Sequence, residues 1–562
     1  MNNHNPSNPL IVQGDYTILV EVNSPRYAAA RDGLAQFAEL VKSPEHVHTY
    51  RITPLSIWNA CASGVDPQTI VRTLEEFTKY PIPDHVLTGV GDFASRYGRL
   101  RIVQESTGLL LVSDEDVLAE EISRAKGVAK YLGERLSPSK FLIDPFNRGR
   151  IKQELIKVGY PAEDLAGYVS GEKLGIDLLN TTRSDLPFSP RPYQQAAADA
   201  FYAGGTARGG SGVIVLPCGA GKTIVGMTCM AQVQASTLIL TTSITAIRQW
   251  KAELLDKTGL REDQIAEYSG KTKDIKPVTV ATYNIMTYRR SKEASFLHLA
   301  LFDERDWGLI IYDEVHLLPA PVFQVTASLQ ARRRLGLTAT LVREDGREDD
   351  VFALIGPKKA DAPWKTLEAQ GWIAQATCTE IRIPLPDDLR MPYAVADARR
   401  KFRIASENPT KEVVVRQLLE RHKDDHVLII GMYVDQVKGI ADRLGIPVIT
   451  GSTSQLRRDK LYSDFKEGLF PVMAVSKVAN FAVDLPDASV AIQISGMFGS
   501  RQEEAQRLGR ILRPKEGVNQ AQFYTLVSKD TSEQDFALKR QLFLCEQGYE
   551  YRIQDGMNNA AI

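Results

Sequence analysis

Short apolar runs alternate with longer amphipathic segments over two parts of the chain. The first part covers residues 191–356 and predicts buried strands at 213–216, 238–241, 278–281, 309–312 and 334–337. The second covers residues 411–527 and predicts strands at 427–430, 447–449, 472–475, 490–494 and 523–527. Such alternation is typical of a parallel sheet with helices on both faces. The pattern therefore predicts two α/β lobes in tandem.

The N-terminal part has a different pattern. A helix is signalled by Asp66 as a cap and Pro67 at its first position, with apolar residues at helical spacing up to Phe77. Apolar runs predict strands at 10–12, 17–22, 100–103 and 109–112. Helices followed by a small β-ribbon indicate a smaller α+β accessory domain, winged-helix-like, that would hold DNA or a protein partner.

The chain has 562 residues, enough for about three to four domains. A basic amphipathic helix at 150–158 and a polar, Pro-containing stretch at 180–190 mark a change of composition before the first lobe. We expect a disordered tail at 1–8, the accessory domain at 9–140, a short region and linker at 141–190, lobe 1 at 191–365, a connection at 366–410, lobe 2 at 411–540 and a C-terminal tail at 541–562.

Composition excludes some classes of protein. The formal net charge is −1, so any nucleic-acid site has to be local. The five cysteines are scattered without a C-x-x-C pair, which argues against zinc and disulfides. His46 and His48 would share one face of a strand, but no third metal ligand lies nearby, so a structural role is favoured. No apolar run approaches about 18 residues, and a cytoplasmic protein is the default expectation.

A glycine-rich loop follows the first strand of lobe 1. Small residues there let the backbone curl around a polyphosphate, and Lys222 can reach the β- and γ-phosphates while Thr223 offers a hydroxyl to Mg²⁺. The first glycine of the general G-x-x-x-x-G-K-[ST] pattern is replaced by Leu216, so an ordinary Gly-rich turn is the alternative. The candidate nucleotide-binding residues are Pro217, Cys218, Gly219, Ala220, Gly221, Lys222 and Thr223.

Two acids end the strand at 309–312, the place where ligands bind in doubly wound sheets. Asp313 suits Mg²⁺, and Glu314 suits a position beside the attacking water. Taken alone, the pair could equally be a helix cap. Together with Lys222 and Thr223, about 90 residues earlier, the catalytic interpretation is favoured.

Two more stretches have residue types suited to nucleotide chemistry. Thr338, Ala339 and Thr340 end the next strand with small side chains that could couple the phosphate pocket to another surface. In lobe 2, the spacing places Gln506, Arg510 and Arg513 on one helical face. Such faces are usually only solvated, but an arginine supplied across a cleft can neutralise charge on the γ-phosphate.

At these residues the chain resembles superfamily 2 helicases, and within them the XPB family of DNA repair helicases. The matching stretches are Gly-Ala-Gly-Lys-Thr (219–223), Asp-Glu-Val-His (313–316), Thr-Ala-Thr (338–340) and Gln-Arg-Leu-Gly-Arg-Ile-Leu-Arg (506–513). Similar stretches at 9–13, 46–50, 191–194, 335–345 and 484–486 extend the resemblance over almost the whole chain. The pattern is that of a compact, bacterial- or archaeal-type member, since the C-terminal extension of the eukaryotic members is missing.

The resemblance implies an ATP- and Mg²⁺-dependent 3′-to-5′ DNA helicase or double-strand translocase with two RecA-like lobes. It places Arg191 and Gln194 near adenine, makes Lys222, Asp313, Glu314, Gln506, Arg510 and Arg513 catalytic, and gives Thr223 and Asp313 to Mg²⁺. Residues expected to contact DNA or to couple it to the nucleotide are Ser243, Thr282, Thr338, Ala339, Thr340, Arg343, Glu344, Asp345, Ser476 and Asp484.

The resemblance also implies accessory features. A thumb-like element would fall at 384–408, where basic residues around Phe402 suit phosphates and base stacking, with a solvated basic helix as the alternative. A short damage-recognition-like region would lie at 141–168. The expected partner is DNA at single-strand/duplex junctions, and a nuclease or repair protein is a possible second partner. We expect no membrane association and a monomeric chain. An RNA-directed helicase of the same superfamily and a nucleotide-gated DNA-binding scaffold are the rival functions.

Overall fold

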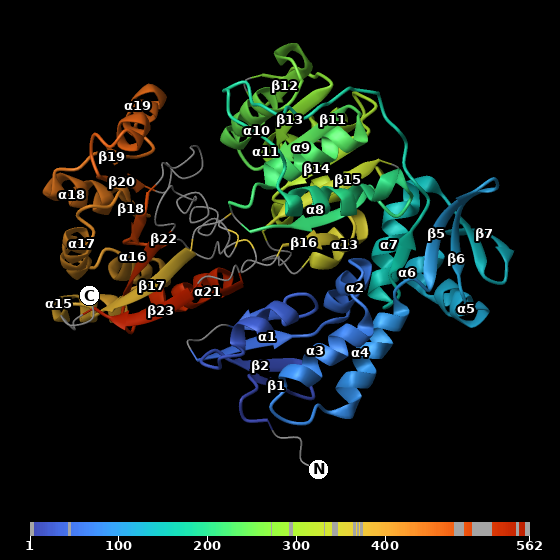
Figure 1. Ribbon diagram of the computed structural model, residues 1–562, viewed down its shortest axis with the longest axis horizontal. Coiled ribbons are helices and arrows are strands. Elements are labelled where there is room, and N and C mark those ends of the chain that lie inside the picture. The colour runs from blue at the N-terminus through green and yellow to red at the C-terminus, as the bar shows by residue number, and fades with distance from the viewer. Residues whose placement is uncertain are drawn as a thin grey trace.

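The computed structural model describes residues 5–42, 46–217, 219–270, 272–291, 296–330, 332–339, 347–362, 367, 370, 372, 375–476, 488–496, 520–546 and 550–556. Two seven-stranded sheets form the two lobes, and sheets of four and five strands form the N-terminal part. In Figure 1, lobe 1 is green, lobe 2 is orange and red, and the N-terminal part is blue and cyan. Within these residues, no helix is long and apolar enough to cross a bilayer, and no cluster of three or more His, Cys, Asp or Glu side chains could hold a metal ion.

The first N-terminal unit is an antiparallel sheet, with strand order β1-β2-β4-β3, packed against four helices. The helix predicted after Asp66 is confirmed, because the Asp66 carboxylate accepts a hydrogen bond from the backbone N–H of Gln68 and caps it. The elements are β1 (Leu10–Val12), β2 (Thr17–Glu21), α1 (Tyr27–Leu34), β3 (Glu39–Lys42), β4 (Val47–Arg51), α2 (Pro54–Ala62), α3 (Pro67–Phe77) and α4 (Asp84–Arg96).

The second N-terminal unit is a five-stranded sheet with the order β7-β8-β6-β5-β9. The predicted ribbon is its central hairpin β5–β6, which β8 and β9 extend on either side. The boundary expected at residue 140 falls inside β8 and is therefore corrected: this unit continues to Asp164, where β9 pairs with β5. The elements are β5 (Leu100–Glu105), β6 (Gly108–Ser113), α5 (Asp116–Arg124), α6 (Lys126–Ala129), β7 (Leu132–Ser137), β8 (Lys140–Ile143), α7 (Arg148–Lys157) and β9 (Ala162–Asp164).

The segment between this sheet and lobe 1 is packed along lobe 1. Lys173 forms an antiparallel bridge with Ala235, and Leu178 forms one with Thr258. The Ile176 side chain is fully buried in the core of lobe 1. The stretch expected to be a linker therefore follows a fixed path over the lobe.

Lobe 1 is a parallel sheet with the order β12-β13-β11-β14-β15-β10-β16, which confirms the predicted α/β class. Side chains alternate between two apolar cores, so that Ile214 and Ile311 face one core while Val213 and Ile310 face the other. Its strands are β10 (Ser211–Val215), β11 (Thr237–Thr241), β12 (Ile265–Tyr268), β13 (Val278–Thr282), β14 (Leu309–Asp313), β15 (Arg333–Thr338) and β16 (Lys358–Asp361). Its helices include α8 (Pro192–Tyr202), α9 (Lys222–Val233), α10 (Ile244–Lys257), α11 (Tyr283–Met286), α12 (Ala320–Thr326) and α13 (Glu348–Leu354).

Lobe 2 is also entirely parallel, with the order β19-β20-β18-β21-β22-β17-β23. Its strands are β17 (Gln375–Ile383), β18 (Val427–Gly431), β19 (Val448–Ile449), β20 (Val472–Ser476), β21 (Val490–Gln493), β22 (Gln520–Ser528) and β23 (Glu550–Asp555). Its helices include α15 (Asp387–Val395), α16 (Ala398–Ser406), α17 (Thr410–Arg421), α18 (Val434–Leu444), α19 (Gln455–Lys466) and α21 (Ser532–Glu546).

The bounds predicted for lobe 2 are too narrow at both ends. Strand β17 falls in the expected connection, yet it pairs along its whole length with β22. Strand β23 falls in the expected tail, yet it pairs with the other side of β17. Because these hydrogen bonds are part of one sheet, lobe 2 runs from Gln375 to Asp555.

The first N-terminal unit contacts both lobes. The backbone N–H of Lys358 in lobe 1 donates to Asn59 Oδ1 over 2.9 Å, and the Trp58 ring lies beside Phe352. On the other side, helix α21 of lobe 2 contacts β3, and Cys545 is buried in the core of the N-terminal unit. Figure 1 shows α21 lying above α1, between lobe 2 and this unit.

Candidate nucleotide site and nucleic-acid interface

The predicted phosphate loop connects β10 to α9. Gly219 and Gly221 have φ values of +81° and +79°, a conformation that residues with side chains rarely adopt. A Cβ atom at Gly221 would also lie 2.5 Å from Gln194 Nε2, so a larger residue there would displace the Gln194 amide, which bonds Ala220. Since α9 begins at Lys222, the positive end of its helix dipole lies at the loop and favours an anion there.

Helix α8 supports the loop from behind. Gln194 Nε2 donates to the Ala220 carbonyl over 2.9 Å, and Tyr193 Oη donates to the same oxygen over 2.7 Å. The Arg191 guanidinium lies 4.3 Å from the centroid of the Trp372 ring. Gln194 and Arg191, expected beside adenine, thus lie beside the loop. Tyr193 and Trp372 were not predicted as site residues. The tyrosine within Arg-Pro-Tyr-Gln was the sequence signal that could have identified Tyr193.

Lys222 and Glu314 form an ion pair across the site. Lys222 Nζ lies 2.8 Å from Glu314 Oε1, with side chains that are 13% and 11% exposed. Glu314 has a φ of +52°, which is unusual for a residue with a side chain and is typical of functional positions. Asp313 is the last residue of β14. The structure therefore brings the phosphate-loop lysine and both predicted acids together.

A buried histidine connects the acids to the next strand. His316 Nδ1 lies 3.6 Å from Glu314 Oε2 and 2.6 Å from Thr338 Oγ1, at the end of β15. The Leu216 N–H, just before the phosphate loop, donates to the Thr338 carbonyl over 2.9 Å. Thr338, at the end of β15, is thus hydrogen-bonded both to His316, which follows the acids of β14, and to Leu216, which follows β10. No role was predicted for His316, although it stands two residues after Glu314.

The residues expected to couple DNA binding to the nucleotide occupy several places. Ser243 caps α10 and Thr282 caps α11 through their side chains. Thr338 and Ser476 are fully buried at strand ends, so any coupling through them has to pass through their neighbours. Ala339, next to Thr338, is buried as well. The remaining predicted site residues lie outside the described part of the chain: Cys218, Thr340, Arg343, Glu344, Asp345, Asp484, Gln506, Arg510 and Arg513.

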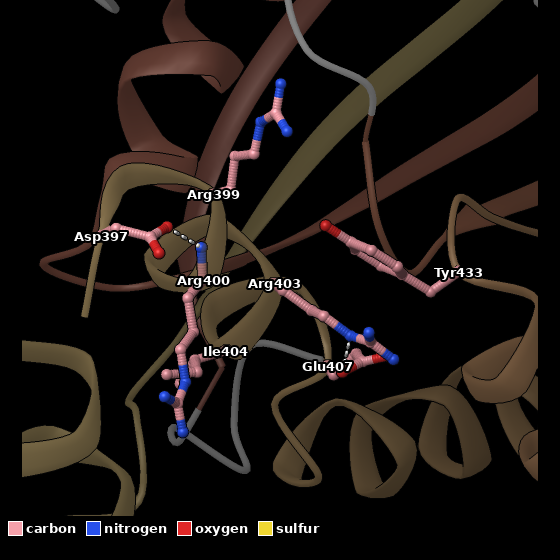
Figure 2. A pocket seen from close by; sticks show the side chains of 7 residues that line it. All are labelled: Asp397, Arg399, Arg400, Arg403, Ile404, Glu407 and Tyr433. Atoms are coloured by element: carbon pink, nitrogen blue, oxygen red, sulfur yellow. Dashed lines mark hydrogen bonds and ion pairs between the residues drawn. The ribbon is translucent and has the colours of Figure 1, made fainter.

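The expected thumb-like element forms helices α15 and α16. The prediction that Phe402 stacks on bases is wrong, because its side chain is fully buried against Phe536 of α21. The basic residues on the other face are exposed and line an open hollow of about 1010 Å³ together with Asp397, Ile404, Glu407 and Tyr433. Figure 2 shows Arg399 and Arg400 pointing in opposite directions from α16, and Arg403 reaching Glu407 beside Tyr433.

The predicted damage-recognition-like region is anchored on lobe 1 by buried charges. Asp164 pairs with Arg148 at 2.6 Å and with Lys152 at 2.9 Å. Burial alone would raise the pKa of Asp164, but these two cations outweigh it and lower the pKa. Burial lowers the pKa of Lys152 to about 8. Lys152 also donates to Gln330 of lobe 1, so the region is fixed to the lobe at this point.

Three family models match most of the chain, and two of them are named as helicase domains. Residues 367–561 match the ERCC3/RAD25/XPB C-terminal helicase model, residues 187–343 match the type III restriction enzyme res subunit, and residues 10–137 match a helicase conserved C-terminal domain.

Whole-chain relatives agree with the family models. The chain is 55% identical over 548 residues to a protein of Kineococcus radiotolerans named DNA 3′-5′ helicase XPB, covering 97% of this chain and 96% of the relative. It is 53% identical to the Mycobacterium tuberculosis protein of the same name, covering 97% and 98%. A Saccharomyces cerevisiae protein named general transcription and DNA repair factor IIH helicase/translocase subunit XPB/SSL2 is 32% identical, covering 97% of this chain and 72% of the relative.

Proposed function

Because this chain belongs to the XPB family of DNA helicases, we propose that it is an ATP-dependent 3′-to-5′ DNA helicase or double-strand DNA translocase that opens duplex DNA during repair. The observation that carries the proposal is the accessible Lys222–Glu314 pair in front of the phosphate loop. Hydrolysis of a nucleoside triphosphate requires a lysine that can bind a phosphate and an acid that can orient the attacking water. This pair would supply both once the lysine moves from the acid to the phosphate.

The residues at the site fit Mg²⁺ and ATP. Asp313 and Thr223 offer carboxylate and hydroxyl oxygens, which Mg²⁺ prefers, and Thr223 is half-buried in the first turn of α9. When bound, Mg²⁺ neutralises charge on the phosphates and orients them. The backbone N–H groups that begin α9 would bind the same phosphates.

The pair suggests how ATP binding prepares the chemistry. A bound polyphosphate attracts Lys222 more strongly than one carboxylate does, since it has several charged oxygens. When Lys222 moves from Glu314 to the phosphates, the Glu314 carboxylate can accept a hydrogen bond from the attacking water. His316 lies 3.6 Å from Glu314 and is hydrogen-bonded to Thr338, so a change of position at Glu314 would act on the end of β15 through this histidine. Arg510 and Arg513 would then supply positive charge from lobe 2.

Movement of the lobes during this cycle would drive translocation. Strands held through their phosphates can be moved without reading their sequence. The hollow beside α16 suits such a contact, because three exposed arginines and Tyr433 line it. We infer that this hollow binds the phosphates of single-stranded DNA at a junction, with Tyr433 in place of Phe402 as the available aromatic ring.

Hydrolysis of ATP with different nucleic acids tests the function. The purified protein is assayed alone and with single-stranded DNA, forked DNA, duplex DNA and a matched RNA. We expect strong stimulation by DNA, little by RNA, and strand separation on a 3′-tailed substrate. Equal or greater stimulation by RNA would favour an RNA helicase. DNA-stimulated hydrolysis without strand separation or translocation would favour a nucleotide-gated scaffold that recruits partners.

The proposed DNA substrate also indicates which partner proteins and which oligomeric state to expect. Opening a junction exposes single strands, so a repair nuclease is the class of partner that would use the product. We expect the chain to bind DNA as a monomer, which light scattering of the protein–DNA complex would test.

A further inference from the structure

Two aromatic side chains hold the predicted magnesium ligand Asp313. The Trp250 indole N–H donates to Asp313 Oδ2 over 2.9 Å. The Tyr283 hydroxyl donates to the Asp313 backbone carbonyl over 2.9 Å. We propose that Trp250 and Tyr283 are positioning residues that orient Asp313 and make its orientation depend on contact between lobe 1 and DNA. The dependence on DNA rests on the proposed function, whereas the positioning of Asp313 does not.

The Trp250 ring is fixed in place between two elements of the nucleotide site. Its side chain is 1% exposed. A Cβ atom at Gly226, in α9 directly after the phosphate loop, would lie 2.5 Å from Trp250 Cη2. The absence of a side chain at Gly226 thus lets the ring pack against α9 while its N–H meets β14. A ring held on both sides can direct its hydrogen bond to only one oxygen of Asp313.

The two aromatic residues come from the segments that are expected to face DNA. Trp250 lies on α10, which Ser243 caps, and it follows Ser243 by seven positions, or about 10 Å of helix. Tyr283 is the first residue of α11, which Thr282 caps. A shift of either helix end on binding a DNA strand would therefore move a hydrogen bond to Asp313. In this way two separate contacts on the DNA side would act on one metal ligand.

Conservative variants remove the hydrogen bonds and keep an aromatic ring, and the controls undergo the same two substitutions. Trp250→Phe and Tyr283→Phe are compared with Trp307→Phe and Tyr268→Phe. Trp307 and Tyr268 are buried in the same lobe; the Trp307 indole N–H donates to the Leu301 carbonyl, and the Tyr268 hydroxyl forms a hydrogen bond with His298 Nδ1. The affinity of a fluorescent ADP analogue is measured with Mg²⁺ and with EDTA, and ATP hydrolysis is measured with and without single-stranded DNA.

We expect the affinity in EDTA to be unchanged in all variants. The gain in affinity that Mg²⁺ confers should fall about 10-fold in Trp250→Phe and less in Tyr283→Phe, which affects only a backbone carbonyl. The ratio of DNA-stimulated to basal hydrolysis should fall as well. The control variants should keep both quantities within about 2-fold of the wild type.

The two parts of the inference fail in different ways. Unchanged Mg²⁺-dependent ADP affinity in Trp250→Phe, or an equal loss in Trp307→Phe, overturns the positioning of Asp313. Reduced Mg²⁺-dependent affinity with an unchanged ratio of DNA stimulation overturns the coupling. A wild-type protein whose hydrolysis DNA does not stimulate overturns the proposed function, and the ADP measurement still decides the role of Trp250.

Discussion

The two lobes have the same strand order, position for position, but their equivalent strands lead into different structures. Strand β10 of lobe 1 and β17 of lobe 2 each occupy the sixth place in a seven-stranded parallel sheet. The first leads into the phosphate loop, and the second leads into Pro384, Pro386 and the exposed helices α15 and α16. The topology provides the same location in both lobes, and the residues after the strand decide its chemistry.

Each lobe contains a lysine–glutamate ion pair, and the two pairs differ in how far their side chains are exposed. Lys222–Glu314 and Lys411–Glu533 both have N–O distances of 2.8 Å. The side chains of the first pair are 13% and 11% exposed, whereas those of the second are 0% exposed. A pair that a ligand can reach can exchange partners, and an enclosed pair can only hold the fold. Exposure, rather than distance, separates function from structure here.

The largest effect on activity is expected for Lys222→Ala. Loss of the phosphate-binding cation should lower ATP hydrolysis about 1000-fold or more while the thermal unfolding midpoint stays within a few degrees. A steady-state ATPase assay together with calorimetry measures both. Lys251→Ala, which removes an exposed pair with Glu262, is the control and should hydrolyse ATP normally. Retained hydrolysis in Lys222→Ala would remove the basis for the assigned site.

The largest effect on stability is expected in lobe 2. Lys411→Met leaves the Glu533 charge buried without its cation and should cost about 3–5 kcal/mol in the free energy of unfolding. The double variant Lys411→Met/Glu533→Gln should recover part of this, because the charge is gone. Urea denaturation followed by circular dichroism gives both values. If Lys411→Met unfolds like the wild type, enclosure is not what distinguishes the two pairs.

The N-terminal sheet offers a buried ionisable group that is neutral. His48 is 5% exposed, its Nδ1 lies 2.9 Å from Tyr27 Oη, and burial, with the nearby Arg31, lowers its pKa to about 4. The unfolded chain binds this proton near pH 6.5, so stability is full above pH 6.5 and is lost as the pH falls toward 4.

Replacing His48 tests that loss. Between pH 7 and pH 4 the group should account for about 3 kcal/mol, an upper limit that partial opening would reduce. His48→Gln should show a smaller fall in the unfolding free energy over this range than the wild type does. Parallel curves for the two proteins would mean that folding does not lower the pKa of His48.

The smallest effect is expected at the exposed arginines of lobe 2. Arg399→Ala/Arg400→Ala should weaken single-stranded DNA binding about 10-fold and reduce the slope of log affinity against log salt by about 1 for each lost phosphate contact. Fluorescence anisotropy at several salt concentrations measures both. Arg416→Ala, an exposed arginine of α17 paired with Glu412, is the matched control. Equal losses in the two proteins would leave the hollow without a specific role.

Local sequence signals predicted the elements that carry their own pattern. The phosphate loop combines a β-branched strand, glycines and a helix, and Asp66-Pro67 begins a helix, so both were identified. Strand β17 was missed because its polar Thr and Glu residues interrupt the apolar run, although β22 and β23 cover both its edges. Phe402 was misassigned because a basic helix does not reveal which face meets α21 until the partner is known.

The contacts of Asp313 lay beyond sequence reasoning for a different reason. Trp250 and Asp313 are 63 residues apart in the chain, and only the order of β11, β13 and β14 in the sheet brings them together. Neither hydrophobic periodicity nor motif spacing predicts a hydrogen bond between two residues so far apart in the sequence. The candidate ligand could be named from the sequence, whereas the groups that orient it required the fold.

The N-terminal unit contacts lobe 1 through Asn59 and lobe 2 through α21, and the chain itself connects the two lobes. Three bodies linked in this way form a closed ring, which has fewer independent rotations than an open chain of three. Lobe 2 therefore cannot rotate toward lobe 1 about the interlobe connection alone. Each such rotation must slide α21 over β3, detach it, or move the N-terminal unit along with lobe 2.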